Sequence, residues 1–378
     1  MKTFVSILLL LSTAALTVLS LIQCDRVDLL NDFRPKKVLE SDTRLFVDDL
    51  KTTTNVTLNS NQFPDHEFSF QIDTGLWQGA EPWSDRADGP RAIEKLVLFA
   101  HNTTIVDHLE VRSKHLAKYG FDKNSIRVKL RNSLGDVIAD FNIGKASAWK
   151  KKIEGKQELR VPTVYLRRND LGDKHQIYLC TDFSGNIHKL FRDQLKAFRD
   201  HRPFALNINT LEKVRLLRGK TEIELSHENP TAPWMLKKPL ELNSAPKQVM
   251  AFLANLSKLE AIALHSKKEV ALPKSLDNVL QVAISNFNSE KETILTVYPA
   301  TNGAGSCYAT VSNRDVVFEL PLISTPKVSN YITQLPESIN ELRSRNMLHL
   351  DKAMRADLKS IFIRTPITPD EAVIISRL

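Results

Sequence analysis

The sequence predicts an α+β protein in which an N-terminal transmembrane helix is followed by two tandem repeats of an antiparallel-sheet-plus-helices unit. Three observations predict this fold class. They are an apolar N-terminal segment, a Trp-x4-Pro element that occurs twice, and the same series of helix-like and strand-like segments after each copy of that element. The 378 residues are enough for two or three domains with buried cores.

The N-terminal segment, residues 4–22, is apolar apart from small hydroxyl residues and follows Lys2. Its nineteen residues would span about 28 Å as a helix, close to the roughly 30 Å of membrane hydrocarbon. We therefore expect a membrane anchor in residues 1–24 and a linker over 25–44. A cleaved secretory signal, or lipoprotein processing at Cys24, are the alternatives. Lys2 favours an N-inside orientation, which predicts a single-pass protein of the cytoplasmic (inner) membrane of a bacterium, with most of the chain on the periplasmic side.

The first repeat unit is expected over residues 45–205. A strand pair at 45–50 and 56–58 precedes Trp77, which is followed five positions later by Pro82. An amphipathic helix then follows, with apolar residues at the spacing i, i+3, i+4, i+7: Ile93, Leu96, Val97 and Ala100. Four β-branched segments predict strands at 126–130, 137–143, 164–167 and 177–179. A second helix is expected through Leu195, Phe198, Arg199 and Leu206.

The second unit, residues 206–350, repeats this order. Trp234 and Pro239 mirror the first Trp-x4-Pro element, and the same helical spacing recurs 156 residues later at Val249, Phe252, Leu253 and Leu256. Strands are expected at 279–285, 293–298, 307–311 and 316–320, and a second helix through Ile339, Leu342, Arg343 and Leu350. Segments 214–217 and 222–225 flank Gly219-Lys220 and predict a hairpin. Residues 351–378 are expected to form a capping hairpin, from strands 358–363 and 372–375, that completes the second sheet.

The repeated landmark residues have structural interpretations. A Trp before a Pro at a strand-to-helix corner is typical of a packing anchor, and ligand stacking by both Trp77 and Trp234 is the alternative. Arg199 and Arg343 are the polar positions shared by the two repeats. We expect each to tether a helix to a carboxylate or carbonyl, with partner docking as the alternative.

Composition and motifs indicate no particular chemistry. The net charge of +8 is spread along the chain, and its densest cluster is predicted to be a solvated loop between strands: Lys145, Lys150, Lys151, Lys152 and Lys156. The sequence contains no Gly-x-Ser-x-Gly, His-Glu-x-x-His or Cys-x-x-Cys motif. His101, His108 and His115 recur every seven residues, but segments that break a helix separate them, so we do not expect a metal site. Of the three cysteines, Cys180 and Cys307 are not expected to pair. The sequence thus predicts no catalytic residue, no cofactor and no metal.

An ordered set of motifs resembles a known family. The set comprises the Trp-x4-Pro corner, the helix at Ile93, Phe-Asn-Ile-Gly at 141–144, Val-Tyr-Leu-Arg at 164–167, Ile-Tyr-Leu at 177–179 and Phe-Arg-Asp-x4-Phe-Arg at 191–199. Together, over about residues 45–350, these resemble the bacterial family catalogued as domain of unknown function 4340. The second copy lacks evident equivalents of Arg167 and of 141–144. The resemblance implies a membrane-anchored, extracytoplasmic protein that accompanies ABC transporters of the gliding-motility type.

These observations lead to one expected function and two alternatives. The first hypothesis is a non-enzymatic accessory or interaction protein, anchored in the membrane and part of a transporter-type complex. The second is a module that binds cell-envelope polymer or a small ligand, for which the basic balance suits an anionic partner. The third is an enzyme whose site the sequence does not reveal. Nucleic acid is not an expected partner, because aromatic residues are not interleaved with the lysines.

Overall fold

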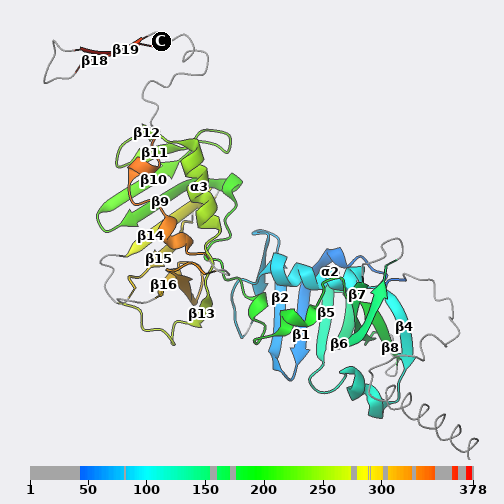
Figure 1. Cartoon of the computed structure of the whole chain (residues 1–378). Coiled ribbons are helices and arrows are strands. Elements are labelled where there is room, and N and C mark those ends of the chain that lie inside the picture. Colours follow the sequence, from blue (N-terminus) through cyan, green and yellow to red (C-terminus); the bar gives the residue numbers. More distant parts are fainter. Residues whose placement is uncertain are drawn as a thin grey trace, which may run out of the picture. The chain divides into compact units, whose positions relative to one another are not determined.

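The computed structural model describes residues 43–344, apart from residues 81, 154–159, 171–175, 274–278, 288, 290, 301–304 and 326–328, together with the backbone of 360–364 and 372–376. The chain divides into two compact units, Met1–Asp200 (unit 1) and His201–Leu378 (unit 2). The division falls five residues before the boundary expected at 205/206. The described elements of both units are drawn in Figure 1.

Unit 1 is built on an eight-stranded antiparallel sheet with the order β3-β2-β1-β5-β6-β7-β8-β4. Its strands are β1 (Thr53–Ser60), β2 (Phe63–Gln71), β3 (Leu76–Gly79), β4 (Ile105–Glu110), β5 (Ile126–Asn132), β6 (Val137–Lys152), β7 (Arg160–Arg168) and β8 (Gln176–Thr181). The four strands predicted from β-branched segments, now β5 to β8, are confirmed, although β6 is much longer than expected. The predicted strand at 45–50 is wrong, because Leu50–Thr52 forms the short 3-10 helix η1 and the strand begins at Thr53.

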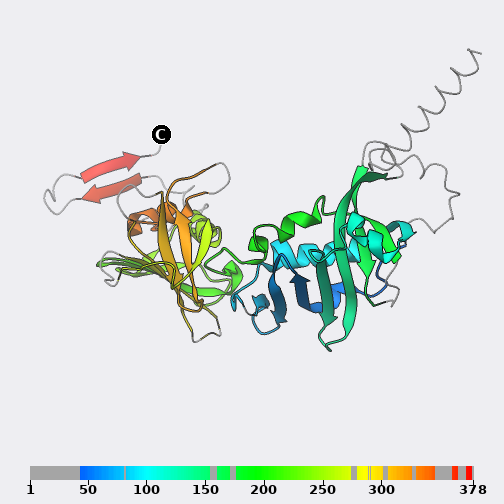
Figure 2. The same cartoon turned by 90° about the horizontal axis from the view of Figure 1, so that it is seen from below.

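One face of the unit 1 sheet is covered by helix α2 (Glu94–Asn102), which follows a single π-helical turn, η2 (Gly89–Ile93). Figure 2 shows α2 lying along that face. Asp88 caps the start, since its carboxylate accepts from Arg91 N at 3.1 Å. All four predicted apolar positions of this helix are buried in the core of unit 1. Further short 3-10 helices are η3 (Ser113–Tyr119), η4 (Ile187–Phe191) and η5 (Lys196–Phe198).

Unit 2 is built on a nine-stranded antiparallel sheet with the order β12-β11-β10-β9-β14-β15-β16-β17-β13. Its strands are β9 (Leu211–Arg218), β10 (Thr221–Ser226), β11 (Met235–Lys238), β12 (Leu242–Asn243), β13 (Ala263–Ser266), β14 (Leu280–Asn286), β15 (Thr293–Val297), β16 (Ser306–Val311) and β17 (Val316–Pro321). The hairpin at Gly219-Lys220 is confirmed, because Arg218 pairs with Thr221 and Gly219 has a φ of +57°.

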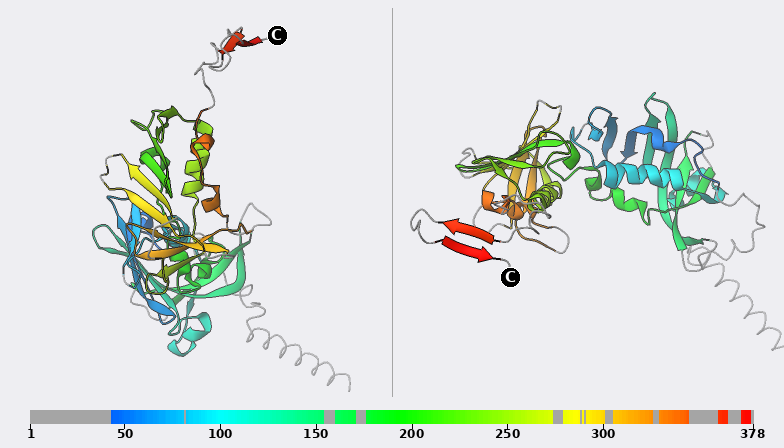
Figure 3. Two further views of the ribbon diagram at one scale, coloured as in Figure 1. Left: turned by 90° about the vertical axis from the view of Figure 1, so that its left-hand side faces the viewer. Right: turned by 90° about the horizontal axis from the view of Figure 1, so that it is seen from above.

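Helix α3 (Pro246–Ser257) packs on one face of the unit 2 sheet, and Figure 3 shows it standing against the strands. Its four predicted apolar positions are buried in the core of unit 2. The remaining 3-10 helices of this unit are η6 (Ile208–Thr210), η7 (Tyr331–Gln334) and η8 (Ile339–Glu341). Among the described residues, no helix that packs in this core lies on the other face of the sheet.

The two sheets have the same strand order. Starting from the hairpin, the order β2-β1-β5-β6-β7-β8-β4 of unit 1 matches the order β10-β9-β14-β15-β16-β17-β13 of unit 2. Along the chain, α2 comes just before β4 and α3 comes just before β13, and these two strands correspond. A backbone hydrogen bond also recurs at the helix start. It runs from Asp88 N to Phe198 O at 2.9 Å in unit 1 and from Ala245 N to Leu342 O at 2.7 Å in unit 2.

The predicted α+β class is wrong, since the structure is mostly β-sheet, with 43% strand and 20% helix. The second helix predicted in each unit is replaced by short 3-10 turns. In unit 1, residues 193–195 have φ values of +52°, +53° and +63°, a left-handed conformation that a right-handed helix cannot contain. In unit 2, η8 ends at Glu341, and Leu350 lies outside the described residues.

The described helices also contradict the predicted membrane localisation. Within the part of the chain that the structure describes, no helix combines the length and the apolar character needed to cross a membrane. The expected single-pass anchor and the prediction of an inner-membrane protein are corrected accordingly. Residues 4–22, on which that prediction depended, lie outside the described residues, as do Cys24 and residues 25–42 of the linker expected at 25–44.

Two further expectations fail on strand geometry. The lysine cluster was predicted to be a loop, but Lys145, Lys150, Lys151 and Lys152 lie on β6, which pairs with β7 as far as Lys152, and Lys156 lies outside the described residues. The C-terminal strands β18 (Ser360–Arg364) and β19 (Ala372–Ser376) pair with each other in a separate two-stranded sheet. The hairpin therefore does not complete the sheet of unit 2.

Candidate functional site

The uncovered face of the unit 2 sheet carries an ordered set of charged side chains. Strand alternation creates it: Val214 and Leu216 of β9 point into the core, so Lys213 and Arg215 point to the opposite face. On β10, Ile223 and Leu225 are buried in the core, so Glu222 and Glu224 lie on the same uncovered face as the β9 cations. We call this surface the charged face of unit 2.

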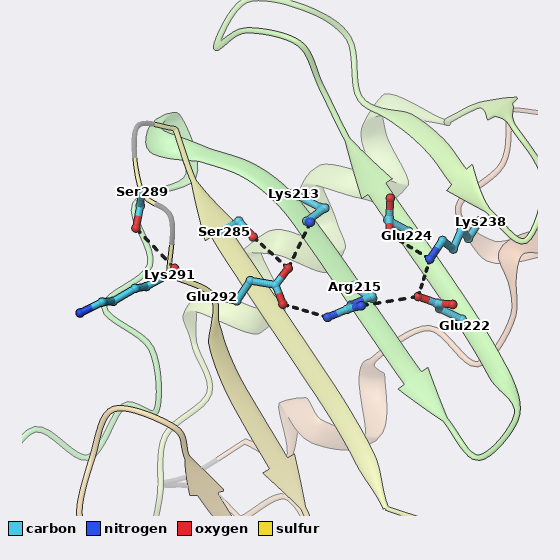
Figure 4. Close-up of polar contacts among 9 residues, drawn as sticks. All are labelled: Lys213, Arg215, Glu222, Glu224, Lys238, Ser285, Ser289, Lys291 and Glu292. Atoms are coloured by element: carbon cyan, nitrogen blue, oxygen red, sulfur yellow. Dashed lines mark hydrogen bonds and ion pairs between the residues drawn. The ribbon is translucent and has the colours of Figure 1, made fainter.

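Glu292, just before β15, lies between the two cations of β9. Its carboxylate contacts Lys213 Nζ at 3.1 Å and accepts from Arg215 Nη2 at 2.8 Å, and Ser285 Oγ donates to it at 3.3 Å (Figure 4). Burial disfavours the ionised carboxylate, but the hydrogen bond from Lys213 and the charges of Arg215 and Lys213 outweigh it, so the pKa of Glu292 lies below its ordinary value. Glu292 is therefore ionised at neutral pH and joins β9 to β15 across β14.

The network continues across β10 to β11. Arg215 Nη1 lies 3.9 Å from Glu222 Oε1, and Lys238 Nζ bridges Glu222 at 3.0 Å and Glu224 at 3.6 Å (Figure 4). The hydrogen bond that Lys238 donates to Glu222, and the charge of Glu222, raise the pKa of Lys238. Three cations thus alternate with three carboxylates, and their charges cancel within the network. Because these side chains are about one sixth to one half exposed, they remain accessible to a partner.

A shallow hollow lies within this charged face. Its volume is about 270 Å³, and it is lined by Arg215, Leu217, Glu222, Gln281, Ala283 and Ile294. Leu217 is 36% exposed, whereas Ala283 is buried. The hollow therefore combines an apolar floor with one cation and one carboxylate at its rim.

A second polar group lies at the β13 edge of the same sheet. Glu319 of β17 accepts from Ser306 Oγ at 2.7 Å, and its other oxygen lies 3.0 Å from His265 Nε2. Burial raises the pKa of Glu319, but the hydrogen bonds from Ser306 and His265 outweigh it and the net shift is downward. Ser and His both contact the carboxylate, so this group lacks the serine-to-histidine hydrogen bond of a nucleophile and its base.

The two landmark tryptophans occupy matching places in the two units. Trp77 of β3 is 7% exposed and packs on Phe70, with ring centroids 5.5 Å apart. Trp234, directly before β11, is half-buried and stacks on His227 at 4.1 Å. Each tryptophan thus contacts the aromatic side chain seven residues before it. The contacts are those of packing anchors.

The other landmarks do not form a common site. Pro82 and Pro239 are exposed, and Pro239 follows a cis peptide bond. Arg199 and Arg343 match in their backbone bridges, to Ala87 and Ser244 respectively. Their side chains differ, because Arg199 lies over the Trp83 ring at 5.4 Å, whereas Arg343 is exposed.

Candidate metal ligands are dispersed. His101, His108 and His115 lie on α2, β4 and η3 respectively. Among the described residues, no group of three or more His, Cys, Asp or Glu side chains is placed to hold a metal ion. Cys180 and Cys307 are free and buried, and burial raises the pKa of the Cys307 thiol to about 11.

Sequence reasoning missed the charged face. The signal that could have found it is the alternation Lys213-x-Arg215 on one strand of the predicted hairpin and Glu222-x-Glu224 on the other, which places opposite charges on one face. Comparison with family models, curated proteins and solved structures gives no match to this chain. The resemblance to the family of unknown function stays a prediction.

Proposed function

We propose that the protein is a non-enzymatic interaction protein that binds a partner protein through the charged face of unit 2. The observation that carries this proposal is the combination of a partly exposed, charge-balanced network with an adjoining hollow whose lining includes Leu217, Ala283 and Ile294. Protein interfaces have this anatomy, in which an apolar centre is surrounded by a polar rim.

The size of the hollow favours a protein over a small molecule. At about 270 Å³ and open to solvent, it is smaller than the roughly 300–1,000 Å³ of typical ligand pockets. A hollow of this size fits one apolar side chain. The rim charges would then set the orientation of a partner whose own surface carries both signs.

The resemblance drawn from the sequence motifs makes a transporter-type complex the first partner to test. In this proposal the protein acts as an accessory subunit, and the ATPase and permease components of an ABC transporter are the candidate partners. Mixed charges at the rim would give specificity and a fast association rate more than affinity.

Affinity purification of the full chain from cell extracts, with mass spectrometry of the captured proteins, tests the proposal. The decisive variant is Leu217→Glu, which places a charge in the hollow next to Glu222. The matched control is Ile72→Glu, because Ile72 is an apolar side chain of unit 1 with 80% exposure. We expect transporter subunits to co-purify with the wild-type and Ile72→Glu proteins and to be lost with Leu217→Glu.

Two results would contradict the proposal. One is recovery of the wild-type protein without transporter subunits. The other is equal recovery of those subunits with Leu217→Glu, which would move the contact away from the charged face.

A further inference from the structure

The face of the unit 1 sheet opposite α2 holds two arginines on either side of one asparagine. Asn142 of β6 pairs with Arg127 of β5 on one side and with Arg167 of β7 on the other. The two arginine Cα atoms are therefore about 10 Å apart, as expected across two antiparallel pairings. Both side chains are long enough to converge over Asn142. Neighbouring residues on each strand, such as Val128 and Leu166, point into the core.

Arg167 is half-buried, and no described carboxylate forms an ion pair with it. Its guanidinium lies over the Phe121 ring at 5.6 Å. Burial lowers the pKa of Arg167, and repulsion by Arg127 lowers it further. A cation held in this way is stabilised when an anion approaches it.

Asp140, a carboxylate of β6 on the same face, is already shared. Asp140 accepts from Arg127 Nε and Nη2 at 2.8 and 2.6 Å, lies 3.8 Å from Lys129 Nζ, and accepts from Asn169 Nδ2 at 2.8 Å. Arg127, Lys129 and Arg167 carry three positive charges against the single negative charge of Asp140, which leaves +2. A phosphate group at neutral pH carries about −1.5 to −2, which balances this excess.

The surroundings hold the site in shape before any ligand arrives. Gly144 lets the 119–121 segment pack directly on β6, because a Cβ at this position would lie 2.3 Å from Tyr119 O and 2.8 Å from the Phe121 ring. This contact positions Phe121 beneath Arg167. The Asn142 amide donates to Ser125 Oγ at 3.1 Å, which fixes the asparagine between the two arginines. The Ser125 hydroxyl can then donate its own proton to a bound group.

The fold itself does not require this arrangement. In the corresponding strands of unit 2, namely β14, β15 and β16, the equivalent row of paired residues is Gln281, Thr296 and Thr310. The same sheet is therefore built there without the cations, which indicates a role specific to unit 1.

We propose that Arg127, Asn142 and Arg167 form a binding site for the phosphate group of a small soluble ligand. The Arg167 guanidinium supplies a planar fork for two phosphate oxygens, a geometry that a lysine ammonium cannot reproduce. Arg127 and Lys129 add charge from the neighbouring strand, and the Phe121 ring limits access of water on one side. This inference is independent of the proposed partner binding by unit 2.

Calorimetric titration of the full chain at low ionic strength tests the site, with inorganic phosphate and glycerol 3-phosphate as separate probes. We expect saturable binding of at least one probe, and at least tenfold weaker binding by Arg167→Met. Arg167→Lys should be intermediate, because it keeps the charge and loses the fork. The matched control is Arg218→Met, which removes an arginine of the unit 2 sheet that is paired with the carboxylate of Glu337 and should leave phosphate binding unchanged. Tighter binding of glycerol 3-phosphate than of inorganic phosphate would identify a phosphate monoester as the ligand class.

Thermal unfolding separates a binding role from a structural one. Without phosphate, Arg167→Met should be at least as stable as the wild type, because it removes a half-buried charge that lacks a carboxylate. At tenfold excess over the dissociation constant, the Tm of the wild type should rise by about 3–5 °C while that of the variant stays constant. The proposal is overturned if neither probe binds the wild type, if sodium chloride at equal ionic strength gives the same rise, or if Arg167→Met binds as the wild type does.

Discussion

The buried ion pair between Arg86 and Asp200 tests what holds the end of unit 1 against the rest of the unit. Arg86 Nε donates to Asp200 Oδ2 at 2.8 Å, and the side chains are only 9% and 2% exposed. Beside it, Asp200 N donates to Arg86 O at 3.1 Å; the equivalent hydrogen bond of unit 2 runs from Ser344 N to Asn243 O at 2.7 Å. We infer that this backbone hydrogen bond is a shared feature of both units, whereas the ion pair is specific to unit 1.

The perturbation is Asp200→Asn, which leaves the buried Arg86 guanidinium without this carboxylate. Removing one partner of a buried ion pair costs about 3–5 kcal/mol, because the remaining charge loses this partner while it stays out of water. At about 2–4 °C per kcal/mol for a unit of this size, the Tm of unit 1 should fall by roughly 6–20 °C. The double variant Arg86→Met/Asp200→Asn should lose about 2–3 kcal/mol less than the sum of the single variants.

The assay is urea unfolding of the full chain, followed by near-ultraviolet circular dichroism, for the wild type, both single variants and the double variant. The control is Asp315→Asn, since the Lys267–Asp315 pair, with 2.6 Å between Nζ and Oδ1, has side chains that are 51% and 86% exposed. An exposed pair of this kind contributes about 0–1 kcal/mol. If Asp200→Asn costs no more than Asp315→Asn, or if the single effects simply add, the reasoning is refuted.

Two further predictions concern unit 1. Gly144→Ala should destabilise the protein by about 1–3 kcal/mol in urea unfolding, because the new Cβ collides with the Tyr119 carbonyl. The control Gly305→Ala should be neutral, because the nearest atom to its new Cβ is 3.8 Å away. Equal effects of the two substitutions would refute the argument. The second prediction follows from His66, whose pKa is lowered by burial, against the opposing effects of its Pro64 carbonyl contact and of the Asp65 charge. Its stabilising contribution is complete above the unfolded pKa of about 6.5 and is lost as pH falls below it, since the unfolded chain takes up a proton that the folded state disfavours. The Tm difference between pH 7.5 and 5.5 should therefore be smaller for His66→Phe than for the wild type, and an unchanged difference would contradict the assignment.

Local periodicity predicted much of the secondary structure. The eight apolar positions of the two predicted helices are all buried, because the spacing i, i+3, i+4, i+7 places them on one side of a helix. The predicted second helices are wrong. Three successive residues with positive φ at 193–195 break the first, and in place of the second there is a 3-10 turn that ends at Glu341. The extension of β6 to Lys152 was missed because pairing with β7 continues through polar residues that carry no alternating apolar signal.

The sequence by itself determined which side chains face each core, where the central helices begin and which segments become most of the strands, because each of these depends on a period of two or 3.6 residues along the chain. Only the tertiary structure decided which strands lie side by side. Arg215 and Glu292 are 77 residues apart and meet because β9 pairs with β14, and Arg127 and Arg167 flank Asn142 because β6 lies between β5 and β7. The physical reason is that alternation assigns a residue to a face, whereas the neighbour across the strand is chosen by long-range pairing and by packing of the sheet against its helix.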